Sequence, residues 1–179
     1  MNVSKPHAKN FKSDRGSKRS GETTMINKQI LVLMLAALMM VNPVAADDVD
    51  HFLKITPPPQ GVVFEIVEAG KDRLADLLPK VLSAIEKIRS IHPQMEFAVV
   101  SHGREEFALQ TKNQGLFAGI HEKVKSLVAD DVPVHVCETH ASWYGVTPED
   151  FPDYVNVAPT GPGQIALYEE LGYHLIVIE

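Results

Sequence analysis

Several classes of protein are excluded by what this sequence has little of. The 179 residues include one cysteine, so the chain cannot form an intrachain disulfide or supply a multi-cysteine zinc or iron–sulfur site. Basic residues do not predominate, since the formal net charge is −6, and nucleic acid is therefore not expected as a partner. Aromatic residues amount to 7% and charged residues to 22%, which is typical of a globular protein and not of a disordered one. The length fits a single domain.

Charge is distributed unevenly along the chain. The stretch from Lys5 to Lys28 holds 7 of the 17 basic residues and only two acidic ones, Asp14 and Glu22. From Asp47 onward the chain carries 10 basic and 21 acidic side chains, a net charge of −11. The two regions are therefore different kinds of polypeptide, and only the second has the balance of a folded acidic domain.

The apolar run between these regions is short. Residues 30–41 (ILVLMLAALMMV) are uncharged, but a helix that spans a bilayer needs about 20 such residues. Lys28 precedes the run and small residues up to Ala46 follow it, which is the pattern of a secretory signal peptide with cleavage after Ala46. We expect a signal peptide at 25–46, preceded at 1–24 by a disordered basic extension or a mis-assigned start. The mature protein would be periplasmic or secreted without stable membrane insertion; an uncleaved anchor is the alternative.

The mature chain is expected to be a leader followed by one domain. Residues 47–60 are acidic and then proline-rich, which predicts an extended leader. From 61 to 179, short apolar stretches alternate with amphipathic helical patterns. Strands are predicted at 62–67, 97–100, 132–136, 155–157 and 174–178, and helices at 74–88, 117–128 and 161–171. The alternation predicts a single α/β domain with a mainly parallel five-stranded sheet flanked by helices on both faces.

The carboxyl ends of the predicted strands indicate where chemistry would take place. In open α/β sheets, ligands bind outside these ends. Glu68 follows the first predicted strand, His102 the second, and Cys137 with His140 the third. All of them are expected at the same edge of the sheet, at distances that depend on the strand order.

Cys137 is the sharpest of these candidates. A lone cysteine in an exported protein is either an intermolecular partner or a free thiol. Helix amides directed at the sulfur would favour the thiolate, because Cys137 ends a strand and precedes a predicted helical turn. His135 and His140 would add positive charge, while Glu138 would oppose it. The alternative is a buried cysteine that packs as a small hydrophobic residue, but the position after a strand favours a functional thiol.

The same segment also suggests a metal site, as a weaker alternative. His135, Cys137 and His140 offer the imidazole and thiolate ligands that suit copper or zinc, with His102 as a fourth ligand. Their spacing matches no strong zinc signature. No metal is therefore assigned.

Two further features are interpreted as structural. Residues 161–166 imitate a dinucleotide-binding fingerprint, but they open the last helix and no acidic residue follows about 20 positions later. No cofactor is therefore expected. Trp143 and Tyr144 stand next to Gly145 and could form the wall of a pocket over Cys137, but aromatic residues near a turn are more often packing residues and are interpreted as such.

From Gly61 to Glu179 the chain resembles the DsrE/DsrF-like (YchN-like) family of sulfur-relay proteins. The matching features are the opening strand, the segment VHVCETHA at 134–141 and the alternating order of strands and helices. The segment YVNVAPTGPGQIALYEELGY at 154–173 resembles the tail of a branch with exported members. The resemblance covers essentially all of the expected mature domain.

This resemblance implies a flavodoxin-like α/β domain that assembles as a homo-oligomer, a trimer or a hexamer. In the better-understood members the corresponding cysteine carries sulfur as a persulfide, a role that would fall on Cys137. The chain departs from them in its export signal, since the well-studied members work in the cytoplasm. It also has a single cysteine, so onward transfer must go to another protein or to a small thiol.

The hypothesis that results is an exported sulfur carrier or sulfurtransferase. A Cys137 thiolate would attack the outer sulfur of a sulfane-sulfur donor and pass that sulfur to a second thiolate. His140 or His102 would stabilise the thiolate or move a proton. The expected partners are sulfur donor and acceptor proteins or small thiols. The alternatives are a non-catalytic periplasmic binding or assembly module and, third, a metal-binding protein.

Overall fold

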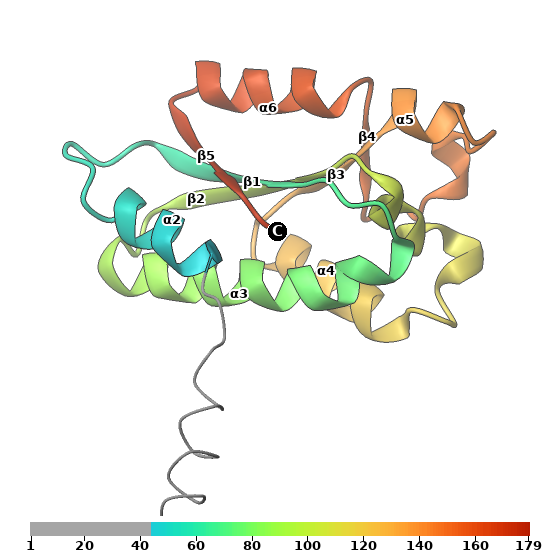
Figure 1. Cartoon of the computed structure of the whole chain (residues 1–179), viewed down its shortest axis with the longest axis horizontal. Helices are drawn as coiled ribbons and strands as arrows, with labels where there is room; N and C mark the ends of the chain where they lie inside the picture. The colour runs from blue at the N-terminus through green and yellow to red at the C-terminus, as the bar shows by residue number, and fades with distance from the viewer. Residues whose placement is uncertain (1–43) are drawn as a thin grey trace, which may run out of the picture. The chain divides into compact units, whose positions relative to one another are not determined.

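Strands and helices alternate through the domain, as the sequence predicts (Figure 1). The computed structural model describes residues 44–179. The order is α2 (Val44–Phe52), β1 (Gly61–Ile66), α3 (Leu74–Ile91), β2 (Glu96–Ser101), α4 (Ala118–Ala129), β3 (Val134–Cys137), α5 (Glu138–Ser142), β4 (Asn156–Ala158), α6 (Gly161–Glu170) and β5 (Tyr173–Val177). Short 3-10 helices fill several of the connections, including η3 at Arg104–Leu109.

All five strands are parallel and lie in the order β4-β3-β2-β1-β5. β1 lies between β2 and β5, and its residues are buried on both faces of the sheet, with Val62, Val63 and Phe64 fully inaccessible. Such two-sided burial explains why its sequence, GVVFEI, is nearly continuously apolar. The predicted α/β, flavodoxin-like architecture is confirmed, and the mainly parallel sheet is entirely parallel.

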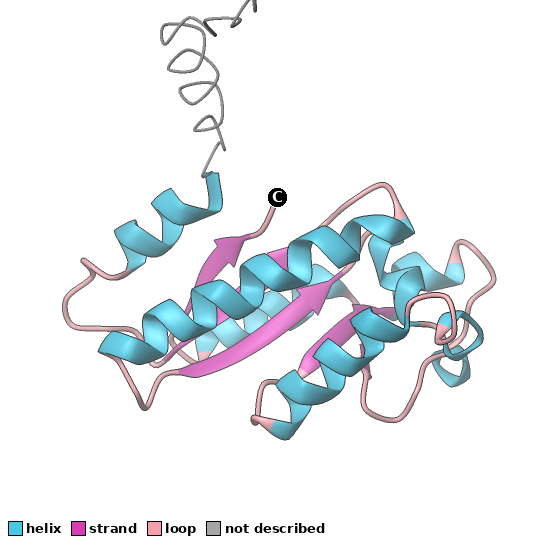
Figure 2. Cartoon of the chain, turned by 90° about the horizontal axis from the view of Figure 1, so that it is seen from below, coloured by secondary structure: helices cyan, strands magenta, loops and turns pink. Residues whose placement is uncertain are grey.

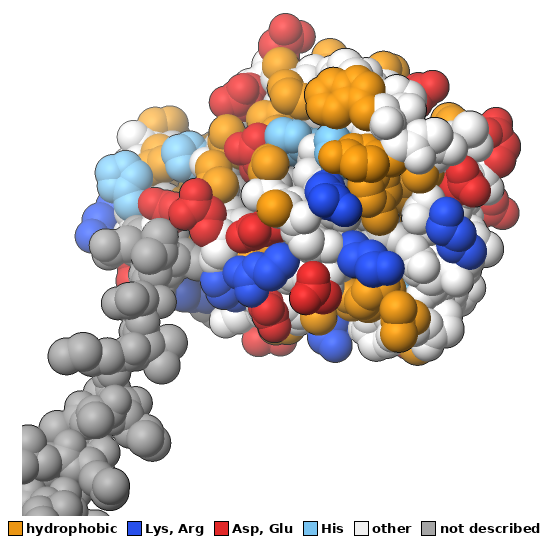
Figure 3. All heavy atoms as spheres, turned by 45° about the vertical axis from the view of Figure 1, so that its right-hand side comes forward, with side chains coloured by type: hydrophobic (Ala, Val, Ile, Leu, Met, Phe, Trp, Pro, Cys, Tyr) orange, Lys and Arg blue, Asp and Glu red, His pale blue; other side chains and the backbone are white. Residues whose placement is uncertain are grey.

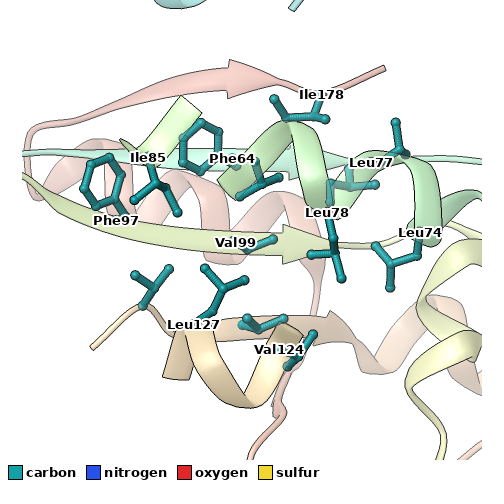
Figure 4. Close-up of a cluster of buried hydrophobic side chains, with 14 of the residues drawn as sticks. Phe64, Leu74, Leu77, Leu78, Ile85, Phe97, Val99, Val124, Leu127 and Ile178 are labelled. Carbon is teal, nitrogen blue, oxygen red and sulfur yellow. The ribbon is translucent and has the colours of Figure 1, made fainter. Parts of the chain in front are cut away.

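One face of the sheet carries most of the hydrophobic core. Apolar residues of α3 recur every three or four positions, so they form a stripe that packs on the strands. Ile85 of this stripe lies beside Phe64 of β1 and Phe97 of β2, and Leu77 and Leu78 belong to the same buried cluster (Figure 4). Each such fully buried side chain contributes about 1.5–3 kcal/mol. Seen from below, α3 and α4 lie in front of the strands (Figure 2).

The opposite face has a smaller core beneath α6 (Figure 1). Val63, Ala98 and Val100 project to this side because successive strand residues alternate between faces. Ile165 and Tyr168 of α6 pack on them. The helix therefore covers β1, β2 and β3 on its way from one edge of the sheet to the other.

The region predicted to be an extended leader is partly helical. Residues 47–52 belong to α2, so the expectation of an extended segment over 47–60 is wrong for these residues. Val49 and Phe52 are 3% and 2% exposed and join the core on the α3 side. Their spacing of three residues places both on one face of the helix. Burial of this face against the core stabilises the segment as a helix.

Other expectations concern parts of the chain that the structure does not describe. The basic extension at 1–24 and the signal peptide at 25–46 lie outside the described residues, apart from 44–46 at the start of α2. Within 44–179, no helix combines the length and the apolarity that crossing a membrane requires.

Candidate functional site

The carboxyl ends of β1, β2 and β3 are level with one another. Ile66 of β1 pairs with Ser101 of β2, and Ser101 pairs with Val136 of β3. His102 and Cys137 are the next residues of their strands, so they follow neighbouring strands at the same edge of the sheet. The expectation that the candidate residues share one edge is confirmed.

Cys137 lies where β3 gives way to α5. It is the N-cap residue of that helix, and the backbone N–H of His140 donates a hydrogen bond to its Sγ atom over 3.3 Å. The side chain takes the role that serine or aspartate usually has at this position. Cys137 is 4% exposed and is a free cysteine. An N–H group directed at sulfur stabilises a negative charge there.

Glu106 connects the backbone of Cys137 to the side chain of His140. Its Oε2 accepts a hydrogen bond from the Cys137 amide at 2.8 Å, and its Oε1 lies 2.7 Å from Nδ1 of His140. Glu106 is fully buried. Burial raises the pKa of this carboxyl to about 8; the hydrogen bond from Cys137 opposes the rise and the charge of Glu105 adds to it.

His140 is therefore paired with a carboxylic acid at neutral pH. Burial lowers the pKa of the imidazole, the charge of Glu105 raises it, and His102 and Arg104 lower it further. With both groups neutral, the O–H of Glu106 donates to Nδ1, and Nε2 carries the ring proton. One of the two protons of this neutral pair therefore lies in the hydrogen bond between Glu106 and Nδ1.

His102 has a different partner. Its Nε2 lies 2.7 Å from Oε1 of Glu65, which is on β1. The backbone at Gly161, the first residue of α6, approaches so closely that a Cβ there would meet Cβ of His102 at 2.4 Å. The structure thus places His102 at the predicted edge, and its side-chain hydrogen bond goes to Glu65.

Glu105 joins the loops that follow β1 and β2. Its carboxylate accepts hydrogen bonds from Ser101 Oγ at 2.8 Å and from the amides of Gly103 at 2.9 Å and Glu68 at 2.6 Å. Glu68 contributes its backbone here, while its side chain forms an ion pair with Arg73 at 3.6 Å. Glu105 is fully buried, so three donors surround a charge that water cannot reach.

Aromatic rings surround the imidazole of His140. The ring of Phe107 stacks on it at a centroid distance of 5.4 Å, and Tyr144 and Trp143 lie at 5.3 and 5.5 Å. Trp143 is 73% exposed. The interpretation of Trp143 and Tyr144 as packing residues is therefore incomplete, because both also form the wall beside His140.

A surface hollow of about 540 Å³ is lined in part by two of these rings, Phe107 and Tyr144. Its lining comes from the loop after β1, from η3 and the residues that follow it, and from Tyr144 and Val146. On the face drawn in Figure 3, histidine (pale blue) lies beside hydrophobic side chains (orange), with Lys and Arg (blue) next to them. We refer to this space as the η3 hollow.

The histidine closest to Cys137 in sequence is engaged elsewhere. Nε2 of His135 lies 2.9 Å from the hydroxyl of Tyr168 on α6, and burial lowers the pKa of this imidazole. Within residues 44–179, the structure brings no three His, Cys, Asp or Glu side chains together in a geometry for a metal ion.

Sequence reasoning missed three carboxylates of the site: Glu65, Glu105 and Glu106. Glu65 lies within the apolar stretch 62–67, whose pattern predicts a strand and does not indicate a functional carboxylate. Glu105 and Glu106 stand just after the second strand and directly before the apolar residues 107–109. The sequence did contain one signal for this pair: two adjacent acidic residues at the carboxyl end of a strand lead directly into an apolar turn. Such carboxylates are expected to be buried, and the backbone N–H groups of nearby loops can supply the hydrogen bonds that a buried carboxylate needs.

Comparisons with known proteins bear on the fold alone. No family model matches the chain, and no curated protein matches it. A solved structure of a protein of unknown function, MTH1491 from Methanobacterium thermoautotrophicum, is similar with a TM-score of 0.53 and 22% identity. The similarity covers 65% of this chain and 96% of that one. It supports the α/β architecture of the described domain.

Proposed function

We propose that the protein is a sulfur carrier or sulfurtransferase that accepts sulfane sulfur as a persulfide on Cys137. The observation that carries the proposal is the setting of the thiol: Sγ at the N-cap of α5, with the His140 amide directed at it. A thiolate formed there receives a hydrogen bond, and so does a persulfide anion whose inner sulfur takes the same place. The resemblance of 61–179 to the DsrE/DsrF-like family supports the same chemistry.

The transfer step conserves atoms and electrons. The Cys137 thiolate attacks the outer sulfur of a persulfide, a new Sγ–S bond forms, and the S–S bond of the donor breaks. The bonding electron pair leaves with the donor's inner sulfur, which departs as a thiolate and takes up a proton. There is no net oxidation, so no further co-reactant is required.

The neutral Glu106–His140 pair is the local candidate for handling the proton. His140 is uncharged at pH 7 because its pKa is lowered, and its Nε2–H can give a proton to the departing thiolate while Nδ1 takes the proton of Glu106. Glu106 also fixes the orientation of the ring through Nδ1. We assign His140 and Glu106 together as the proton-handling pair. His102 contributes to the lowered pKa of His140, and its own side-chain hydrogen bond goes to Glu65.

Intact-mass spectrometry tests the proposal directly. The protein is incubated with a sulfane-sulfur donor and compared with Cys137→Ser. We expect a gain of one sulfur mass on the wild type alone, reversed by reductant. No gain on a protein whose free thiol has been confirmed would eliminate the carrier function.

A binding or assembly module without catalysis is the second candidate. Apolar side chains of α6 favour it, because Leu167 and Leu171 are 55% and 65% exposed and lie one turn apart. In that case Cys137→Ser would leave assembly and ligand binding unchanged. We further propose that the chain is exported, acts in the periplasm or outside the cell, and forms a homo-oligomer.

A further inference from the structure

The η3 hollow has the size of a small-molecule site. Its volume of about 540 Å³ falls in the range of about 300–1,000 Å³ that ligand sites occupy. Its walls belong to the loops after β1 and β2, which are the loops that deliver Glu68 and Glu106 to the site. The hollow therefore lies at the same edge of the sheet as Cys137.

The charge in the hollow is mostly positive. Lys71, Arg104 and Lys112 line it, against one acidic residue, Asp72. Among residues 44–179, no carboxylate lies within 4.0 Å of the charged nitrogens of these three basic side chains. In a protein with a net charge of −6, three cations free of ion pairs around one hollow favour an anionic ligand.

Gln110 adds an unused hydrogen-bond donor. The residue lines the hollow and is 3% exposed. Its Oε1 accepts a hydrogen bond from Asn113, but its Nε2 has no partner, the one such buried side-chain nitrogen or oxygen in the described part of the chain. Burying an amide donor without a partner costs about 1–3 kcal/mol. A small rotation of the amide toward a ligand oxygen in the hollow would recover part of that cost.

The hollow borders the proposed sulfur site through two aromatic rings. Phe107 and Tyr144 line it, and both contact the imidazole of His140. The guanidinium of Arg104 lies 5.5 Å from the centre of the Tyr144 ring. The hollow and the surroundings of His140 therefore share two aromatic side chains.

We propose that the η3 hollow binds the carboxylates of a small organic thiol or its persulfide, which exchanges sulfur with Cys137. The cations and Gln110 recognise the carboxylate oxygens, and the aromatic rings contact the carbon skeleton. The proposal that the ligand is a thiol rests on the proposed function. The proposal that the ligand is an anion rests on the residues that line the hollow.

Binding is measured apart from sulfur transfer with a probe that cannot react. S-methylglutathione carries two carboxylates and a blocked sulfur, and its dimethyl ester carries none. Calorimetric titration of the full chain should show binding of the acid and affinity at least about tenfold weaker for the ester, because charge-assisted hydrogen bonds are lost.

Variants locate the binding in the hollow. Arg104→Gln with Lys112→Gln should weaken binding of the acid about tenfold or more, and Gln110→Leu should weaken it less. Lys123→Gln, on the exposed surface of α4, is the matched control and should change nothing. Equal affinity for acid and ester, no heat from the acid, or equal affinity of the charge variant and the control would overturn the proposal.

Sulfur loading separates this inference from the function on which it rests. Glutathione persulfide should load Cys137 more slowly in the charge variant, whereas benzyl hydropersulfide, which carries no carboxylate, should load both proteins equally. Equal loading by glutathione persulfide overturns the hollow as its binding site and leaves the carrier function standing. No loading from either donor overturns the carrier function and, with it, the thiol identity of the ligand.

Discussion

Among single residues, Glu106 has the largest consequence for stability. Its pKa is raised to about 8 in the folded protein, against an ordinary value of 4.5. The folded state therefore holds a proton that the unfolded state releases above about pH 4.5. The free energy of unfolding should fall as pH rises from 4.5 to 8 and level off above that. One pKa unit corresponds to about 1.4 kcal/mol, so the loss is on the order of a few kcal/mol.

Glu106→Gln isolates this effect. The amide keeps an oxygen for the Cys137 N–H and offers an N–H to Nδ1 of His140, as the protonated acid does. We expect the variant to lose the decline between pH 5 and 8 and to exceed the wild type in stability at pH 8. Urea unfolding at five pH values measures both proteins. A constant difference between them across that range would show that Glu106 is ionised in the folded state.

The close approach of Gly161 to His102 requires a residue without a Cβ atom at position 161. Gly161→Ala would place a Cβ at 2.4 Å from Cβ of His102, and we expect a loss of about 1–3 kcal/mol from the strain. The hydrogen bond between His102 and Glu65 should weaken, because the imidazole must move. Gly119→Ala in α4 is the control, since nothing lies within 4 Å of its added Cβ. If both variants unfold at the same denaturant concentration, the close approach has no energetic weight.

At the scale of elements, α2 is part of the folded domain. Phe52 is 2% exposed within the main core, so Phe52→Ala should cost about 3–5 kcal/mol. Leu116→Ala, at a residue that is 72% exposed, should cost less than about 0.5 kcal/mol. Equilibrium unfolding in denaturant measures both. A cost for Phe52→Ala that matches the one for Leu116→Ala would mean that α2 does not contribute to the core.

The elements also differ in how well they could be predicted from the sequence. Periodicity predicted α3 because its buried apolar residues recur every three or four positions, and a nearly continuous apolar run predicted β1. Periodicity missed α2, since only Val49 and Phe52 of that helix have the spacing of a buried face, and the acidic residues around them suggested an exposed leader. The pair Glu105–Glu106 was missed for a related reason: long-range hydrogen bonds to Glu68, Cys137 and His140 carry no periodicity.

At the scale of the whole molecule, the exposed side of α6 is the surface to examine for assembly. If the chain forms a homo-oligomer through Leu167 and Leu171, Leu171→Glu should shift sedimentation velocity profiles toward the monomer, because burying a charge at an apolar interface is costly. Leu116→Glu is the matched control at another exposed leucine and should sediment as the wild type. Oligomers of unchanged size in Leu171→Glu would remove α6 as the interface.

The bonds that converge on Glu105 have a consequence for how the molecule receives a ligand. Its carboxylate ties the loop after β1 to the loop after β2, and these are the two walls of the η3 hollow. The amides of Glu68 and Gly103 should exchange with deuterated water as slowly as those of the strands. Because these two loops are already ordered in the free protein, a ligand binds without the entropic cost of ordering them. Its residence time then depends on its own contacts with the hollow.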